Sequence, residues 1–215
     1  MFTGIVEEVG LISHAEERGG DLRIHVQASV VTRDTMPGDS ISVSGVCLTV
    51  VSLTGSGFET ELSRETIAKT APRWSAGEKV NLERAMLASN RFGGHIVSGH
   101  VEGVGAVTDL VAEPGAYRLT VQAPAGMGRY FTPKGSITVD GVSLTLVDVG
   151  GPGGSDPELD RDAFTLWLIP HTLAVTTLGE LAPGSSVNLE PDVIPKYLER
   201  LQLYGSHAAP EGEAS

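Results

Sequence analysis

Short stretches of alternating apolar and polar residues run through the chain, which is the pattern of a β-strand with one buried face. Residues 22–26 and 40–44 alternate in this way, and residues 164–169 form a β-branched and aromatic run. Clusters of Gly, Pro, Asp and Ser interrupt the pattern at short intervals. About six strands in every ~90 residues is the density of a small barrel or sandwich. We expect barrels, because closure leaves no unpaired strand edge, with short helical turns at 63–69 and 171–177.

The chain also contains an internal repeat, in which its second half resembles its first. Residues 37–50 align with residues 133–146 without a gap, and eight of the fourteen positions are identical. The same order holds for Gly-x-Val-Glu at 4–7 and 99–102, and for Val-Asn-Leu-Glu at 80–83 and 187–190. The spacing grows across residues 150–157, a Gly- and Pro-rich segment that is typical of a lengthened hairpin loop. The sequence therefore predicts an all-β chain of two tandem barrels related by internal duplication, over residues 1–95 and 96–191.

A helix with no counterpart in the first copy is expected at residues 192–205. Asp192 is a candidate N-cap, a proline follows early, and a glycine stands at the end. Ile194, Leu198 and Leu201 recur at helical spacing and form one apolar face. This helix either covers its own barrel or joins subunits, and the spacing does not decide between the two. Residues 206–215 are expected to form a flexible tail.

Composition narrows the class of protein. The 15 Lys and Arg residues against 27 Asp and Glu give a net charge of −12, and the absence of a basic run argues against a nucleic-acid partner. The single Cys cannot form an intrachain disulfide, which favours a reducing compartment. The N-terminus lacks the basic start of a signal peptide, and no run approaches the ~20 apolar residues that span a bilayer. We expect a soluble, cytoplasmic protein that makes no membrane contact.

The two copies differ at one reactive atom. Cys47 follows a Ser-Gly-Val turn in the first copy, and Ser143 follows an Asp-Gly-Val turn at the equivalent place in the second. A small Cys or Ser at such a place is often core filler. Because both copies keep Leu-Thr beyond it, the pair instead suggests two equivalent pockets, one of them lined by a thiol.

A segment rich in Gly and His, residues 93–101, joins the two copies. His100 stands where the first copy has Ile5, so the fold does not need it; it is either an acid–base candidate or a hydrogen-bonded residue of the hinge. His95 is five residues away, and no Cys or carboxylate completes a zinc ligand set, so we expect no metal site. Residues 150–154 lack the Lys-Ser/Thr ending of a phosphate loop, which argues against a nucleoside triphosphate.

Four motifs together resemble those of a known family. They are Met-Phe-Thr-Gly-Ile-Val at residues 1–6, Gly-Val-Cys-Leu-Thr at 45–49, Gly-His-Ile-Val-Ser-Gly-His-Val at 94–101 and Asp-Gly-Val-Ser-Leu-Thr at 140–145. They closely resemble the riboflavin synthase family, whose members carry two lumazine-binding repeats, and the resemblance covers nearly the whole chain. It implies that each repeat is a six-stranded Greek-key β-barrel that binds one 6,7-dimethyl-8-ribityllumazine.

The resemblance also implies an activity and an assembly. Two lumazines would react by dismutation, in which one donates a four-carbon unit, to give riboflavin and 5-amino-6-ribitylaminouracil. Neither a metal nor an organic cofactor is implied. The C-terminal helices would join three chains into a homotrimer, and each active site would form between the N-terminal barrel of one chain and the C-terminal barrel of another. Whether the chain associates with lumazine synthase is left open.

The family's site segments map onto this sequence residue by residue. One lumazine would be held by Gly4, Ile5, Val6, Ser40, Cys47, Leu48, Thr49, Glu61, Leu62, Ser63, Arg64, Glu65 and Thr66. The other would be held by Gly99, His100, Val101, Ser143, Leu144, Thr145, Ile169, Pro170, His171 and Thr172, with Lys134 reaching in from a neighbouring chain. The candidate catalytic residues are Cys47, His100, Ser143, Thr145 and Asp192. Two positions depart from the family: Val46 stands where some members have a second Cys, and His171 where an acidic residue is frequent.

Two other classes of function stay open. The first is a non-catalytic lumazine or flavin carrier, such as an optical antenna of the same repeat family. Such a carrier is expected to lose the reactive residues of one barrel, whereas this chain keeps Cys47, His100, Lys134 and Ser143. The second is a binding or scaffold module that uses the barrel for another ligand. The sequence favours the enzyme.

Overall fold

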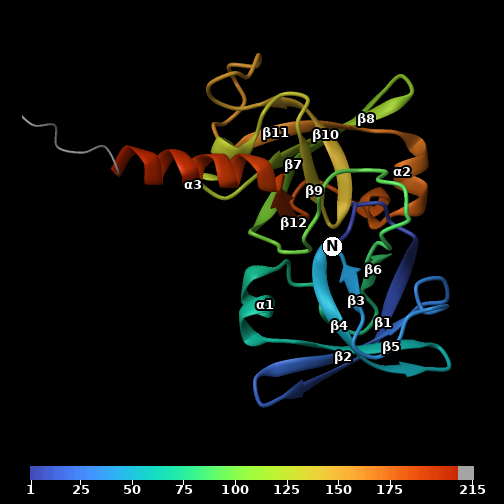
Figure 1. Ribbon diagram of the computed structural model, residues 1–215. Helices are drawn as coiled ribbons and strands as arrows, with labels where there is room; N and C mark the ends of the chain where they lie inside the picture. The colour runs from blue at the N-terminus through green and yellow to red at the C-terminus, as the bar shows by residue number, and fades with distance from the viewer. Residues whose placement is uncertain (208–215) are drawn as a thin grey trace, which may run out of the picture.

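The computed structural model describes residues 1–207, which form two closed six-stranded barrels followed by a helix (Figure 1). The first barrel consists of β1 (Glu8–Arg18), β2 (Asp21–Gln27), β3 (Ser40–Val43), β4 (Val46–Thr54), β5 (Gly57–Leu62) and β6 (Lys79–Arg84). The second consists of β7 (Gly103–Glu113), β8 (Ala116–Gln122), β9 (Ser136–Val139), β10 (Val142–Val149), β11 (Ala163–Leu168) and β12 (Ser186–Pro191). The all-β class and the pair of six-stranded barrels predicted from the sequence are confirmed.

The two barrels have the same strand order, as an internal duplication requires. The first closes in the order β1-β2-β5-β4-β3-β6, and the second, written from β7, in the order β7-β8-β11-β10-β9-β12. In the first barrel β5 lies beside β2, and β6 closes the sheet between β3 and β1, which is a Greek-key connection. The Gly- and Pro-rich segment lies in the hairpin between β10 and β11, where a lengthened loop was expected.

Each barrel encloses an apolar core of its own. In the first barrel Ile24 and Val26, the apolar positions of the alternating pattern on β2, are fully buried together with Phe58. In the second barrel the rings of Phe131 and Phe164 meet edge to face, with their centroids 5.0 Å apart. The alternation that predicts strands therefore points its apolar residues into two separate interiors.

Buried polar side chains hold the two barrels together. The side-chain amide of Asn81 donates to the backbone carbonyl of Asp140 over 2.9 Å, and that of Asn188 donates to the carbonyl of Ser44 over 2.8 Å. Both asparagines belong to the repeated Val-Asn-Leu-Glu motif, so the two bonds are equivalent. Arg73 adds an ion pair to the buried carboxylate of Asp140, with an N···O distance of 3.0 Å. These paired groups fix one arrangement of the barrels, because separating them would leave buried polar atoms unsatisfied.

The helices within residues 1–207 are α1 (Arg64–Lys69), α2 (Pro170–Val175) and α3 (Val193–His207), with 3₁₀ turns η1 (Met127–Tyr130) and η2 (Thr177–Glu180). Ser63 caps α1, because its side chain accepts the backbone N–H of Thr66. Asp192 caps α3 by accepting the N–H of Ile194 over 2.9 Å, as the sequence predicts. Helix α3 continues to His207, two residues beyond the glycine at which it was expected to end.

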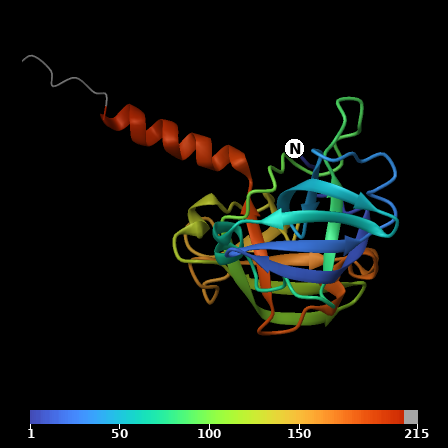
Figure 2. The same cartoon turned by 90° about the horizontal axis from the view of Figure 1, so that it is seen from below.

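Helix α3 extends away from both barrels (Figure 2). Its predicted apolar positions Ile194, Leu198 and Leu201 are 55%, 58% and 69% exposed, so most of this face is not covered within the chain. From residue 208 onward, the tail that was expected to be flexible lies outside the described residues. Along residues 1–207, no helix is both long enough and apolar enough to cross a membrane.

Candidate active site

The two reactive positions lie at the start of equivalent strands. A two-residue turn joins β3 to β4, and another joins β9 to β10. The central residues of these turns, at positions 44, 45, 140 and 141, all have positive φ angles, between 46° and 84°. This is the type I′ geometry, which explains why the sequences are Ser-Gly and Asp-Gly. The turns place Cys47 on β4 and Ser143 on β10, both half-buried.

Each turn is completed by a glycine from the other repeat. The backbone N–H of Ser143 donates to the carbonyl of Gly4 over 2.7 Å, and that of Cys47 donates to the carbonyl of Gly99 over 2.8 Å. The φ angles of the two glycines are +78° and +77°. A Cβ atom on either glycine would lie 2.6 Å from the Cβ atom of its partner, so only glycine fits at these positions.

Residues 4–6 and residues 99–101, the two crossing segments, therefore each lie against the turn of the other repeat. This crossing corrects the grouping expected from the sequence. Residues 4–6 were expected beside Cys47 and residues 99–101 beside Ser143. Instead Val6 packs against the core of the second barrel, and Val101 packs against the core of the first. The segments exchange because they pair with each other: the N–H of Phe2 donates to the carbonyl of Val97 over 2.8 Å, and the N–H of Val97 donates back over 3.1 Å.

Two buried glutamates hold the crossing segments. Glu83 accepts two backbone N–H groups from residues 3–4, at 2.7 and 2.9 Å. Glu190 accepts three from residues 98–100, at 2.7, 2.9 and 3.0 Å. Burial raises the pKa of both carboxyl groups, and the backbone donors act in the opposite direction. The repeat of the Val-Asn-Leu-Glu motif was visible in the sequence, but only the fold shows what its glutamate contacts.

His95, which sequence reasoning did not include in the site, contacts Ser143 directly. Its Nδ1 atom lies 2.8 Å from Oγ of Ser143. The imidazole is 7% exposed, and within the described residues its Nε2 atom has no hydrogen-bond partner. Burial lowers the pKa of His95 below 6.5, although the negative charge of Asp192 acts to raise it. A neutral ring with its proton on Nε2 can accept the hydroxyl proton of Ser143 at Nδ1.

Other predicted residues are exposed near the two turns. His100 and its repeat mate Ile5 are both exposed, so neither barrel uses this position for its core. Thr49 and Thr145 are also exposed, two residues beyond the reactive positions. Lys134 is exposed and has a φ of +67°, at the turn position where the first copy has a glycine. These positions are accessible to a ligand, whereas their individual roles stay predictions.

The predicted segment 61–66 makes structural contacts of its own. Glu61 forms an ion pair with Arg23 over 3.1 Å, and Leu62 is fully buried in the first core. The side chain of Arg64 donates to the carbonyl of Gly19. In the second repeat, residues 169–172 form the start of α2. A ligand role for either segment stays a prediction.

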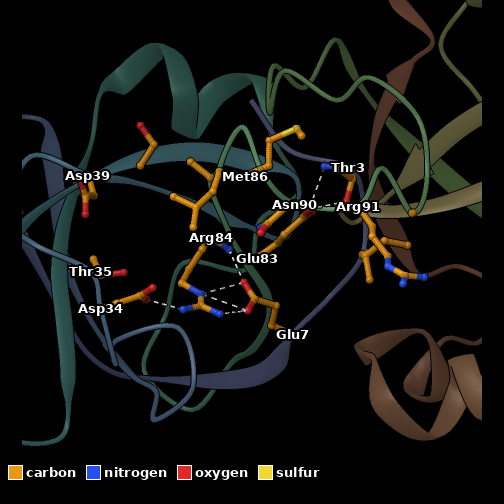
Figure 3. Close-up of a pocket in the computed structure, with 15 residues that line it drawn as sticks. Thr3, Glu7, Asp34, Thr35, Asp39, Glu83, Arg84, Met86, Asn90 and Arg91 are labelled. Carbon is orange, nitrogen blue, oxygen red and sulfur yellow. Dashed lines mark hydrogen bonds and ion pairs between the residues drawn. The ribbon is translucent and has the colours of Figure 1, made fainter.

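A cleft of about 640 Å³ opens on the first barrel beside the crossing segment (Figure 3). Of the predicted site residues, Ile5 and Ser40 line it. Among the charged residues that line it, Arg84 forms ion pairs with Glu7 and Asp34. The turns of Cys47 and Ser143 are not part of the lining, so the cleft adjoins the first segment and does not contain the reactive positions. Across residues 1–207, no three His, Cys, Asp or Glu side chains are grouped so that they could hold a metal ion.

The duplicated barrels match the family model of the lumazine binding domain over residues 3–85 and 98–192. The fold and the paired turns thus define a protein with two lumazine-binding domains. The chain is 42% identical to riboflavin synthase of Photobacterium phosphoreum over 94% of this chain and 89% of that protein. It is 43% identical to riboflavin synthase of Mycobacterium bovis over 94% of this chain and 98% of that protein. The chain belongs to the riboflavin synthase family.

Solved structures of a more distant protein share the fold. Crystal structures of LumP complexed with 6,7-dimethyl-8-(1'-D-ribityl) lumazine and with riboflavin align with TM-scores of 0.73 and 0.76. The identities are 22% and 23%, over 89% of this chain and 99% of each LumP chain. At that identity the likeness concerns the fold alone.

Proposed function

We propose that this chain catalyses the riboflavin synthase reaction, in which two molecules of 6,7-dimethyl-8-ribityllumazine give riboflavin and 5-amino-6-ribitylaminouracil by transfer of a four-carbon unit. The observation that carries the proposal is the pair of equivalent turns, each completed by a glycine segment of the other repeat and each keeping its reactive side chain. The near full-length identity to curated riboflavin synthases supports it. The lumazine and riboflavin bound by LumP support these two molecules as ligands.

The chemistry explains why one chain carries two such turns. The two products together contain every atom of the two substrates, so the reaction needs neither an oxidant nor an external group. The C7 methyl group of one lumazine is acidic, because its carbanion is delocalised into the ring, and it loses a proton while a nucleophile adds to the other lumazine. Holding two identical molecules in a defined arrangement turns a bimolecular encounter into a bound one. Two equivalent pockets, one at each turn, provide the two places.

The contact between Ser143 and His95 provides a route for the proton. The Ser143 oxygen accepts the methyl proton while its own hydroxyl proton moves to Nδ1 of His95, across the 2.8 Å hydrogen bond. The depressed pKa of the buried imidazole keeps it neutral and able to accept. Cys47, His100 and Thr145 are the other groups of the two turns that can take part in acid–base steps.

The active enzyme in this proposal is a cytoplasmic homotrimer. The uncovered apolar face of α3 supports assembly through this helix. The exposed Lys134 is then available to a lumazine bound on a neighbouring chain. Asp192, at the cap of α3, is a carboxylate near the site. Sedimentation of the full chain, compared with a chain truncated after Asp192, tests the assembly: the truncated chain should keep folded barrels and lose the trimer.

The alternative is a carrier that binds lumazine without converting it. Adding 6,7-dimethyl-8-ribityllumazine to the purified protein and following riboflavin absorbance separates the two. Formation of riboflavin together with an equal amount of the uracil product supports the enzyme. Tight binding of lumazine without product would instead establish the carrier, and absence of binding would point to another ligand.

A further inference from the structure

Each crossing segment is followed directly by a glutamate whose carboxylate forms an ion pair with a basic side chain. Glu7 closes Gly-Ile-Val-Glu in the first copy, and Glu102 closes Gly-His-Val-Glu in the second. Each carboxylate side chain is 25% exposed, and each forms an ion pair. The partner of Glu7 is Arg84, and the partner of Glu102 is Lys196. The carboxylates are equivalent by duplication, whereas the cations come from different places in the fold.

Arg84 binds Glu7 from the end of β6, next to the glutamate that anchors the segment. Its backbone N–H donates to the Glu7 carboxylate over 2.8 Å, and its Nε donates over 3.0 and 3.1 Å. In the ladder with β3, Arg84 is the partner of Ile41. This register identifies the equivalent place in the second barrel.

In the second barrel that place is occupied by Pro191. Pro191 is the partner of Ile137, the repeat mate of Ile41. Proline has neither a charge nor a backbone N–H, so it cannot replace either interaction of the arginine. Lys196, in the first turn of α3, supplies the missing cation to Glu102, and its side chain is 36% exposed compared with 32% for Arg84.

The cation matters because Glu102 lies close to Glu190. The negative charge of Glu102 contributes to the raised pKa of Glu190, the carboxylate that accepts three backbone N–H groups of residues 98–100. Lys196 offsets this repulsion at the point where the anchored segment, which carries His100, enters β7.

We propose that Lys196 is a positioning residue for the segment 98–102. The first turn of α3 is then a structural part of the site at the Cys47 turn, which this segment completes, as well as part of a candidate assembly helix. Lys196 acts through Glu102 and Glu190 and does not itself touch the substrate. Its consequence for turnover rests on the proposed function, whereas its effect on the segment does not.

Helix α3 has a second anchor that serves as a matched control. The hydroxyl of Tyr130 donates to Glu199 over 2.7 Å, and Nε of Arg129 pairs with Glu199 over 3.0 Å. This anchor fastens the same helix to the same barrel through Glu199 and not through Glu102, although the charge of Glu102 also acts on Arg129. The variant Glu199→Gln therefore weakens the attachment of α3 while leaving the Lys196 ion pair in place.

Hydrogen–deuterium exchange of the full chain tests the proposal directly. In Lys196→Met the amides of residues 98–100 should exchange about two- to fivefold faster than in the wild type, the range expected for loss of one partly exposed ion pair. Glu199→Gln should leave these amides unchanged, and Lys196→Arg should restore their protection. The double variant Lys196→Met with Pro191→Arg, which recreates the first repeat's arrangement, should also restore it if it folds.

Activity and assembly provide the second readout. If the segment is displaced, kcat for riboflavin formation should fall in Lys196→Met by more than KM rises, while sedimentation shows the wild-type oligomer. Unchanged exchange in Lys196→Met, or equally fast exchange in Glu199→Gln, would overturn the proposal, because the lysine would then be an ordinary helix anchor. A wild-type chain that forms no riboflavin would instead refute the proposed function and leave the exchange result standing.

Discussion

Gly4 and Ser143, in different repeats of the chain, approach so closely that a single added carbon on the glycine would lie 2.6 Å from the serine Cβ. The same relationship joins Gly99 to Cys47. The repeats are therefore not two independent binding modules placed in tandem. Each reactive turn depends on backbone that the other half of the chain supplies.

Replacing either crossing glycine should disrupt one turn. We expect Gly99→Ala to cost on the order of 1–3 kcal/mol of unfolding free energy, because the left-handed backbone is strained and the new methyl group meets Cys47. Urea unfolding and lumazine binding would measure both effects. Gly38→Ala is the control: Gly38 has a φ of +97° but nothing within 4 Å of the added carbon, so it isolates the backbone strain. Equal losses in the two variants would contradict the close contact.

The isolated first repeat, residues 1–90, should fold and bind lumazine only as a dimer. It contains Gly4 and Cys47 but lacks residues 93–101, so a second copy must supply the segment that closes the turn. Sedimentation and lumazine fluorescence should show dimer formation and binding at the same protein concentrations. The dimer should be nearly inactive because it lacks His100 and Ser143. A monomeric fragment with full affinity would contradict the crossing.

His95 should make folding stability depend on pH. Burial lowers its pKa in the folded state below the 6.5 of the unfolded chain. As the pH falls through about 6.5, the unfolded state binds a proton that the folded state does not, so the free energy of unfolding decreases. His95→Gln should lose less stability than the wild type between about pH 7 and pH 5 in urea unfolding, since the two buried glutamates are common to both proteins. Parallel curves would show that His95 is not responsible.

His100→Ile places in the second segment the residue that the first segment already has. Since Ile5 and His100 are both exposed, the fold should survive unchanged. If His100 assists proton movement, kcat should fall by about 10²–10⁴-fold while KM stays within several-fold of the wild type. Exchange of the lumazine C7 methyl protons in D₂O, followed by NMR, separates deprotonation from later steps. Turnover and exchange at wild-type rates would assign a structural role to this histidine.

The barrels could be predicted because their signals are local. Alternation placed Ile24 and Val26 inside, clusters of Gly, Pro, Asp and Ser marked the turns between strands, and Asp192 stood directly before the apolar period of α3. The candidate site segments were identified from four short motifs that occur in the same order as in the family. Each of these features is contained within a few neighbouring residues, so the sequence displays it directly.

The crossing could not be predicted, because a repeat shows which residues are equivalent but not which of two equivalent turns each one contacts. That choice depends on the pairing of Phe2 with Val97, which are far apart in the chain. The importance of His95 likewise comes from its burial and its distance to Ser143, and no local pattern records either.

The exchange of segments also bears on how such a chain arises. In a two-fold symmetric dimer of single repeats, the opening segment of each copy would close the turn of its neighbour. Joining the two copies end to end through the segment before residue 96 would convert that exchange into an intrachain one and keep the contacts of Gly4 with Ser143 and of Gly99 with Cys47. A fused chain of this kind would have two complete turns from the start, and its halves could then diverge, as Cys47 and Ser143 have. A half that lost its partner would keep a complete turn only by pairing with a second copy of itself.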